Sequence, residues 1–271
     1  MTIENRTDAD EVSHVFISPH FDDAVLSCGG MLHQLVKAGQ TVWVMTMMAG
    51  LFNGKLPHTP ILDDLHQRWK AGENPLRARQ IEDINALQSL GVEIIHIPLT
   101  DCVYRLVNGV ALYPSEESLF GEVHPDDYAR QFIDEIGLPF RDSPKTVYIP
   151  LGVGHHVDHQ IIRDWGLRLL QDKPDHIAIK FYAEYPYLNT DHAIDEALDY
   201  YSISLIPNNV ILGDDDIQAK VDAIAYYESQ ISTFWMSLDA MEADVKQSST
   251  HPQTGEYVER FWDISYEGAM Q

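Results

Sequence analysis

The sequence is poor in basic residues and contains no long hydrophobic run. Lysine and arginine together number 18, against 42 aspartates and glutamates, and the formal net charge is −24. Such a charge disfavours binding to nucleic acid and to anionic membranes, so neither is an expected partner. No stretch reaches the roughly 18 uninterrupted apolar residues of a membrane helix. The acidic surface either keeps the protein soluble or attracts a cationic substrate.

Cysteine is also scarce, with two residues in 271. Cys28 and Cys102 are too few and too far apart for a disulfide framework or a CxxC site, so we expect both to stay reduced. The segment Met1–Glu11 is polar and acidic and lacks the basic and apolar regions of a secretion leader. These features together predict a cytoplasmic protein.

Strand-like and helix-like segments alternate along the chain. Strands are expected at His14–Ser18, Thr41–Met48, Val92–Leu99, Thr146–Leu151, Ile177–Tyr185 and near Tyr201–Ile206. Helices are expected at Val25–Ala38, Pro75–Leu90, Pro125–Ile136, Val157–Leu170 and Asp214–Phe234. This alternation predicts an α/β fold with a mostly parallel sheet covered by helices on both faces. Because no repeat or linker interrupts the pattern, we expect a single domain over residues 1–271.

Ligands of such sheets bind in the crevice beyond the carboxyl ends of the strands. Two long polar stretches, Ala49–Asn74 and Thr100–His124, follow strands on that side. Loops of this length are often functional lids or rims, but plain surface insertions are an equally good interpretation.

The motif Pro19-His20-Phe21-Asp22-Asp23 directly follows the first expected strand and precedes the first expected helix. One carboxylate of this turn can ligate a metal while its neighbour stays free to accept a proton. Imidazole and carboxylate suit Zn²⁺ with an open position for water. The alternative is that Asp22 or Asp23 only caps the helix.

A second copy of the same residue types, His124-Pro125-Asp126-Asp127, provides a comparison within the chain. No strand precedes this copy, and its two aspartates stand before the segment Tyr128–Ile136. It therefore predicts a helix N-terminus rather than a metal site. The position after a strand distinguishes the two motifs.

The cluster His155-His156-Val157-Asp158-His159 follows the expected strand Thr146–Leu151 through a glycine-containing turn. A helix that begins near Val157 places His156 and His159 about one turn apart, so both can lie at one site. One histidine could ligate the metal while the other donates to an oxyanion, and Asp158 could orient a catalytic histidine. Two histidines and one aspartate from separate strand ends would form a hydrolytic zinc site with room for water.

The residues around both motifs resemble a known family. Ile17–Gly30 and Gly154–His159 are similar to the two histidine signatures of the LmbE-like, or PIG-L, de-N-acetylases. Further similar segments are Arg79–Glu82 with Ala86 and Leu90–Val92, Asp101, Tyr182–Tyr187 and Lys220–Gln230. The resemblance covers nearly the whole chain and implies a Rossmann-like fold.

The resemblance also implies roles for individual residues. The residues that it assigns to zinc are His20, Asp23 and His159, although Fe²⁺, Co²⁺ or Mn²⁺ could occupy the same donor set. It makes Asp22 the general base, and His156 the imidazolium that stabilises the oxyanion or protonates the leaving amine. The contacts to sugar hydroxyls are assigned to Arg79 and Asp101.

Phe21 and Ala24 depart from the commonest form of the first signature, where proline and glutamate are usual. The sequence resembles members found in antibiotic and other secondary-metabolite pathways. We therefore expect a zinc-dependent hydrolase that removes acetyl from an N-acetylated amino sugar, a GlcNAc-type conjugate or an aminoglycoside precursor. The alternatives are an amidase for a non-acetyl amide and a silent sugar-binding or metal-binding homologue. A homo-oligomer is compatible with the sequence.

Overall fold

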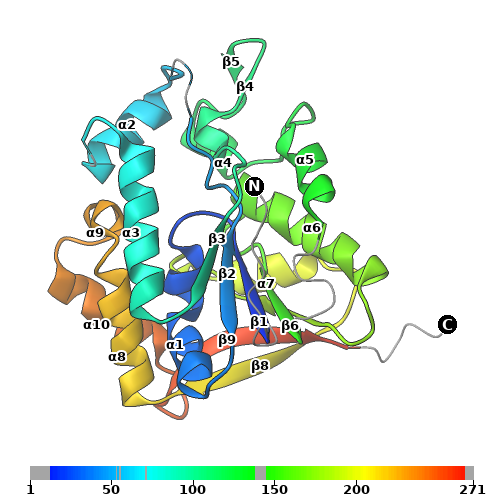
Figure 1. Ribbon diagram of the computed structural model, residues 1–271, viewed down its shortest axis with the longest axis vertical. Coiled ribbons are helices and arrows are strands. Elements are labelled where there is room, and N and C mark those ends of the chain that lie inside the picture. The colour runs from blue at the N-terminus through cyan, green and yellow to red at the C-terminus, as the bar shows by residue number, and fades with distance from the viewer. Residues whose placement is uncertain (1–12, 53, 55, 71, 138–144, 266–271) are drawn as a thin grey trace, which may run out of the picture.

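The computed structural model describes residues 13–52, 54, 56–70, 72–137 and 145–265. Their main feature is a seven-stranded sheet in the order β3-β2-β1-β6-β7-β9-β8 (Figure 1). The five parallel strands are β1 His14–Ser18, β2 Val42–Thr46, β3 Glu93–His96, β6 Thr146–Pro150 and β7 Ala178–Tyr182. Two strands run antiparallel to their neighbours, namely β8 Leu205–Leu212 and β9 Tyr257–Ile264. The segment Met1–Glu11, where we predict no leader, lies outside the described residues.

Helices cover both faces of the sheet, as the alternation predicts. One face packs against α1 Asp23–Lys37, α3 Pro75–Ser89, α8 Asp214–Ile224 and α10 Leu238–Ser249. The other packs against α5 Ala129–Ile136, α6 Val157–Asp172 and α7 Ala193–Asp199. Around the carboxyl ends of the strands lie α2 Pro60–Trp69, the pair β4 Leu106–Val107 and β5 Val110–Ala111, and α4 Glu116–Leu119 (Figure 1). The α/β prediction with a mostly parallel sheet is confirmed.

The predicted helix Asp214–Phe234 is wrong, because the chain turns after Ile224 and resumes as α9 Glu228–Phe234. Two hydrogen bonds to α3 hold the turn between Ile224 and α9 in place. The Tyr227 hydroxyl donates to Asp83 over 2.8 Å, and the Ser229 hydroxyl donates to Glu82 over 2.6 Å. Tertiary contacts therefore override the helical pattern of the sequence.

Several elements were not expected from the sequence. The stretch Ala49–Asn74 contains α2, whose Thr59 caps the helix and whose first residue is Pro60. This is a common helix-start pattern. The strand expected near Tyr201–Ile206 begins only at Leu205, and α7, α10 and β9 had no counterpart in the prediction.

A buried ion pair joins α1 to β9 and to α8, which lies on the same face of the sheet. Glu259 of β9 accepts the backbone N–H groups of Gly30 and Met31, each over 2.9 Å. Lys220 of α8 donates to Glu259 over 2.8 Å and to the Ser27 carbonyl over 3.2 Å. A Cβ atom at Gly30 would lie 2.4 Å from the side chain of Leu212. The glycine therefore permits the close approach of α1 to β8.

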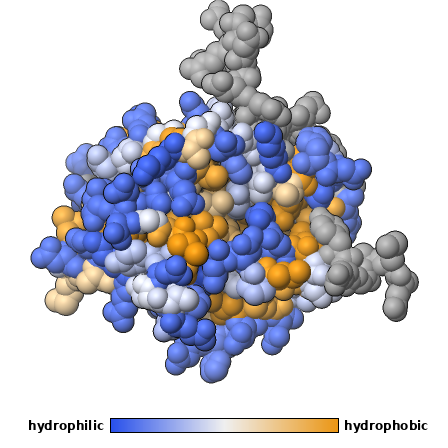
Figure 2. Space-filling view, turned by 90° about the horizontal axis from the view of Figure 1, so that it is seen from below, coloured by the Kyte–Doolittle hydropathy of each residue, from blue (hydrophilic) through white to orange (hydrophobic). Residues whose placement is uncertain are grey.

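Figure 2 shows the face of the molecule that lies opposite to α2 and the pair β4–β5. This face is mostly hydrophilic, with hydrophobic residues gathered near its middle. The edge strand β8 carries two exposed apolar side chains, those of Ile206 and Ile211. Among the described residues, no helix is long and apolar enough to cross a membrane.

Replacement of Glu259 by alanine is expected to destabilise the fold by about 3–5 kcal/mol, because it leaves the Lys220 ammonium buried without its partner. Denaturant unfolding measures this loss. The control is Asp215→Ala, which breaks the exposed Lys37–Asp215 pair of 3.2 Å and should change stability by less than about 1 kcal/mol. Equal effects of the two changes would contradict this account.

Candidate metal centre and active site

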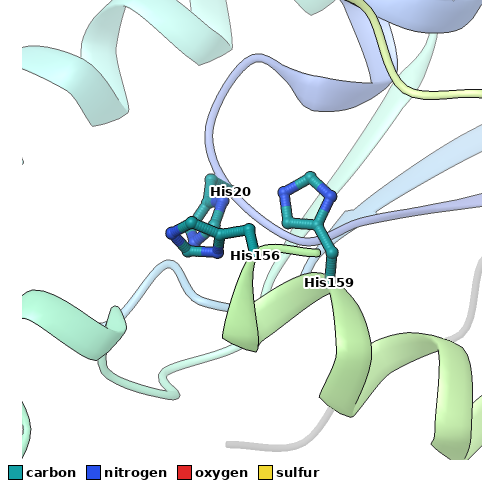
Figure 3. A group of neighbouring side chains, drawn as sticks. All are labelled: His20, His156 and His159. Atoms are coloured by element: carbon teal, nitrogen blue, oxygen red, sulfur yellow. The ribbon is translucent and has the colours of Figure 1, made fainter. Parts of the chain in front are cut away.

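The two histidine motifs meet because β1 and β6 are adjacent parallel strands. His20 lies in the turn after β1, and His156 and His159 lie at the start of α6, which follows β6 (Figure 3). The ring centroid of His20 is 4.9 Å from that of His156 and 5.3 Å from that of His159. Two segments more than 130 residues apart in the chain thus form one cluster.

Asp23 is the link between the two motifs. Its Oδ2 atom lies 3.1 Å from His20 Nδ1 and 3.3 Å from His159 Nε2. The same oxygen accepts the His20 backbone N–H over 2.8 Å. The three residues that the resemblance assigns to zinc therefore lie in direct contact.

His159 has the environment of a metal ligand. Its Nδ1 atom lies 3.2 Å from Glu184 Oε1. Its Nε2 atom is buried and faces Asp23 Oδ2 at 3.3 Å, without the geometry of a hydrogen bond to any described residue. A carboxylate that accepts from one ring nitrogen leaves the other nitrogen free to bind a metal. The donor set of two imidazoles and a carboxylate suits zinc, so the residues fit a metal ion. The three imidazoles of His20, His156 and His159 also lie close enough together to hold one.

Glu184 is a residue of this site that the sequence analysis did not single out. It is fully buried, two residues beyond the end of β7. Its carboxylate also accepts the backbone N–H groups of Gly152 over 2.8 Å and Val153 over 3.1 Å. Glu184 therefore holds both His159 and the turn that carries the second motif. The expected strand Ile177–Tyr185 includes Glu184, whereas β7 ends at Tyr182, so the sequence does not reveal that Glu184 lies beyond a strand end.

The charges around Asp23 favour protonated imidazoles. Although burial lowers it, the carboxylates of Asp23 and Glu184 raise the pKa of His159 to about 9. Burial also opposes the protonation of His20, but Asp101, Asp158 and Asp23 hold its pKa well above the usual value. A metal ion must displace these protons in order to bind.

Asp22 lines a cavity of about 210 Å³, together with its neighbours His20 and Asp23. Its backbone has a positive φ of 116°. Burial raises the pKa of Asp22 to about 8, and the Asp23 carboxylate adds to the rise, while Arg79 opposes it. The nearest Arg79 nitrogen is 3.6 Å from Asp22 Oδ2. A buried carboxyl with a pKa raised in this way is a candidate proton carrier near neutral pH.

His156 lines the same cavity and is the N-cap residue of α6. Its Nδ1 atom accepts the Asp158 backbone N–H over 3.3 Å. Burial, together with the charged rings of His20 and His159, holds the pKa of His156 well below its usual value. Burial and these charges favour the neutral ring, and the assignment of an imidazolium at this position stays a prediction.

Asp158 orients His20 rather than His156. Its Oδ2 atom lies 2.9 Å from His20 Nε2 and accepts the Cys102 backbone N–H over 3.0 Å. Its other oxygen pairs with the guanidinium of Arg105, which is fully buried and lies 2.6 Å from Asp127. The charges alternate along this chain of contacts, which keeps Asp158 ionised.

The second copy of the His-x-Asp-Asp motif has the structural role that its context predicts. Asp127 accepts the backbone N–H of Ala129, the first residue of α5, over 2.9 Å. The same side chain accepts the Tyr113 hydroxyl over 2.7 Å and pairs with Arg105. His124 and Asp126 are not among the residues that line the cavity.

Arg79 and Asp101 both line the cavity and lie 3.8 Å apart. The Arg79 guanidinium lies 4.5 Å from the ring centroid of Trp69, on α2. Asp101 accepts the backbone N–H of Val103 over 3.2 Å.

The two long stretches of the sequence contribute to the wall of the cavity, with Trp69 from Ala49–Asn74 and Phe120 from Thr100–His124. His155, whose role the sequence left open, lies outside this cavity with a φ of 62°.

The family model described as PIG-L, GlcNAc-PI de-N-acetylase, matches residues 15–170. The chain belongs to this family. It is accordingly a hydrolase of amide carbon–nitrogen bonds, a de-N-acetylase.

Relatives and solved structures agree with the family assignment. The chain is 31% identical over 198 residues to the 2'-N-acetylparomamine deacetylase of Niallia circulans. The matched region covers 66% of this chain and 68% of that protein. A deacetylase–teicoplanin complex from the biosynthesis pathway of teicoplanin is 25% identical, with a TM-score of 0.73, and covers 94% of this chain and 99% of that one. The A40926 pseudoaglycone deacetylase is 25% identical, with a TM-score of 0.69 and coverage of 94% and 98%.

In this PIG-L enzyme, Glu184→Gln is expected to weaken zinc affinity by about 10- to 100-fold, because the amide holds His159 less firmly than the carboxylate. Competition with a chelator measures the affinity. The matched control is Glu122→Gln, whose side chain is 92% exposed and should leave the affinity unchanged. A Glu184→Gln protein with wild-type affinity would rule out this role.

Zinc binding to the metal-free protein should release protons at neutral pH. The pKa of His159 is raised to about 9, so protons compete with the metal at every pH below that value. The apparent affinity should therefore rise with pH by about tenfold per unit for each proton displaced, and level off above pH 9. Calorimetry in buffers of different ionisation enthalpy counts the protons. Zinc binding at pH 7 without proton release would contradict this prediction.

Proposed function

We propose that this enzyme uses Zn²⁺ to remove the acetyl group from a 2-acetamido sugar ring in an aminoglycoside-type precursor. The observation that carries the proposal is the position of Asp22 and His156 on the wall of one cavity, beside the cluster of His20, Asp23 and His159. Hydrolysis needs a proton carrier and an oxyanion donor in addition to a metal, and a simple binding protein needs neither. The similarity to a deacetylase of 2'-N-acetylparomamine supports the substrate class.

In this proposal His20, Asp23 and His159 hold the zinc ion. The bound metal would polarise the acetamide carbonyl and lower the pKa of a water molecule. Asp158 and Glu184 keep the two histidines in place through contacts of 2.9 Å and 3.2 Å.

Asp22 carries the proton in both halves of the reaction. It accepts a proton from the attacking water and then delivers it to the departing amine, since a carboxyl with a pKa of about 8 can do both near neutral pH. Arg79, 3.6 Å away, stabilises the ionised form that starts the cycle.

His156 provides the oxyanion contact. A neutral imidazole can donate one N–H group, and the Nδ1 atom of His156 already accepts from the backbone of Asp158. The proton is therefore on Nε2, which can donate to the oxygen of the tetrahedral intermediate.

The sugar ring that carries the acetamide would bind between Arg79 and Asp101. The guanidinium offers donors and the carboxylate offers acceptors, as sugar hydroxyls require. Trp69, Leu119 and Phe120 supply the apolar part of the wall.

The test is to load the metal-free protein with Zn²⁺ and measure acetate release from N-acetylglucosamine, N-acetylated aminoglycosides and the same amines with larger acyl groups. Acetate should be released from the acetyl compounds in preference to the longer acyl groups. If the metal-loaded enzyme hydrolyses only the larger acyl amides, the acetyl assignment is wrong.

The base is tested by Asp22→Ala, which should keep the metal and lower kcat by about 10²- to 10⁴-fold. The matched control is Asp126→Ala, since Asp126 occupies the same position in the second copy of the motif and is exposed. Full activity of Asp22→Ala would remove the assigned base.

A further inference from the structure

A second cavity lies beside the active site. Its volume is about 620 Å³, compared with about 210 Å³ for the cavity that Asp22 lines. The two share a wall made of Phe120 and Tyr187. A volume of this size is within the range of small-molecule binding sites.

The shared wall contacts both histidines of α6. The rings of Phe120 and Tyr187 meet edge to face at 6.0 Å. Phe120 packs against His156 at 5.4 Å, and Tyr187 packs against His159 at 5.7 Å. A molecule that extends over this aromatic pair would therefore reach from the reacting centre into the second cavity.

The turn between β6 and α6 is shaped to form this cavity. Gly154 has a φ of +84°, and a Cβ atom there would lie 2.6 Å from Tyr187. Gly152 has a φ of +91°, and a Cβ atom there would lie 3.0 Å from Arg163. The absence of side chains at both positions lets Tyr187 and Arg163 lie against the turn and line the cavity.

Arg163 is a buried cation in the wall of the second cavity. Its side chain is 1% exposed, and its guanidinium lies 3.5 Å from the ring centroid of Tyr200. The Nε atom donates to Asp164 over 3.0 Å. The Nη2 atom is buried and lies 2.9 Å from the same carboxylate. The guanidinium therefore gives this wall of the cavity a fixed positive charge beside the Tyr200 ring.

One side of α7 forms the opposite wall. Ala193, Glu196, Ala197 and Tyr200 follow the three- and four-residue spacing of one helix face, and Asp199 lies beside them. The wall therefore combines carboxylates, a guanidinium and aromatic rings. This combination suits a ring with both hydroxyl and ammonium groups, because carboxylates accept from both, the guanidinium donates to hydroxyl oxygen, and aromatic rings pack on C–H faces.

We propose that the second cavity binds the neighbouring ring of the substrate, a hydroxylated ring with an amino group, while the acetamido ring lies in the active-site cavity. This inference rests on the proposed function, since it concerns the part of the same substrate that does not react. It makes the enzyme selective for molecules of two or more rings.

The test compares Ala197→Trp, which fills the cavity, with the double change Glu196→Gln and Asp199→Asn, which keeps its shape and removes its charge. The substrates are N-acetylglucosamine, with one ring, and 2'-N-acetylparomamine, with two. Both variants should lower kcat/KM for the two-ring substrate by about 10- to 100-fold and leave the one-ring substrate unchanged. The control is Asp195→Asn, on the exposed side of α7. Equal kcat/KM of wild type and both variants on the two-ring substrate would overturn the subsite.

Binding of paromamine, measured by calorimetry, separates this proposal from the proposed function. The wild type should bind paromamine about tenfold or more tightly than the double variant, whether or not the enzyme releases acetate. If the wild type fails to release acetate but the variants still weaken paromamine binding, the reaction is wrong and the subsite stands. If acetate is released and paromamine binds wild type and double variant equally, the subsite is wrong. The double variant keeps this test decisive even where Ala197→Trp does not fold.

Discussion

One carboxylate oxygen, Asp23 Oδ2, holds the two halves of the proposed catalytic centre together. It lies within 3.3 Å of both His20 Nδ1 and His159 Nε2, which follow different strands of the sheet. This negative charge raises the pKa of both rings. Because β1 and β6 are adjacent parallel strands, the sheet also fixes the two motifs relative to each other.

The interior around this centre must accommodate more acidic groups than basic ones. Asp22, Asp23, Asp158 and Glu184 are all buried. Each buried carboxylate requires compensation by a cation or by hydrogen-bond donors. Arg105 compensates Asp158 and Asp127, and backbone N–H groups compensate Glu184. Burial raises the pKa of Asp22 to about 8, since the opposing charges of Arg79, at 3.6 Å, and of His20 compensate this carboxylate only in part.

The sequence predicts the parts of this structure that depend on local pattern. The strands that precede His20 and His156 are apolar and buried on both faces, so their carboxyl ends, and the residues just beyond them, can be placed without a structure. Glu184 and Arg105 could not be assigned in this way, because their partners are set by which elements lie side by side. The strand β9 is not predicted for a related reason, because Glu259 interrupts its apolar pattern. This carboxylate can be buried because Lys220 and two backbone N–H groups of α1 donate hydrogen bonds to it.

The centre and the wall of the site are built from different kinds of element. The centre is built from the ends of adjacent parallel strands, which the sheet fixes in register. The walls come from short helices beyond those ends, α2, α4 and α7, whose starts depend on local caps such as Thr59 and Ser115. Phe120 and Tyr187 are the exception, since they belong to the wall and yet pack on His156 and His159. We expect a change at either ring to shift the histidine that it packs on, so substrate choice and catalysis would be coupled at Phe120 and Tyr187 and separable along α7, which carries neither ring.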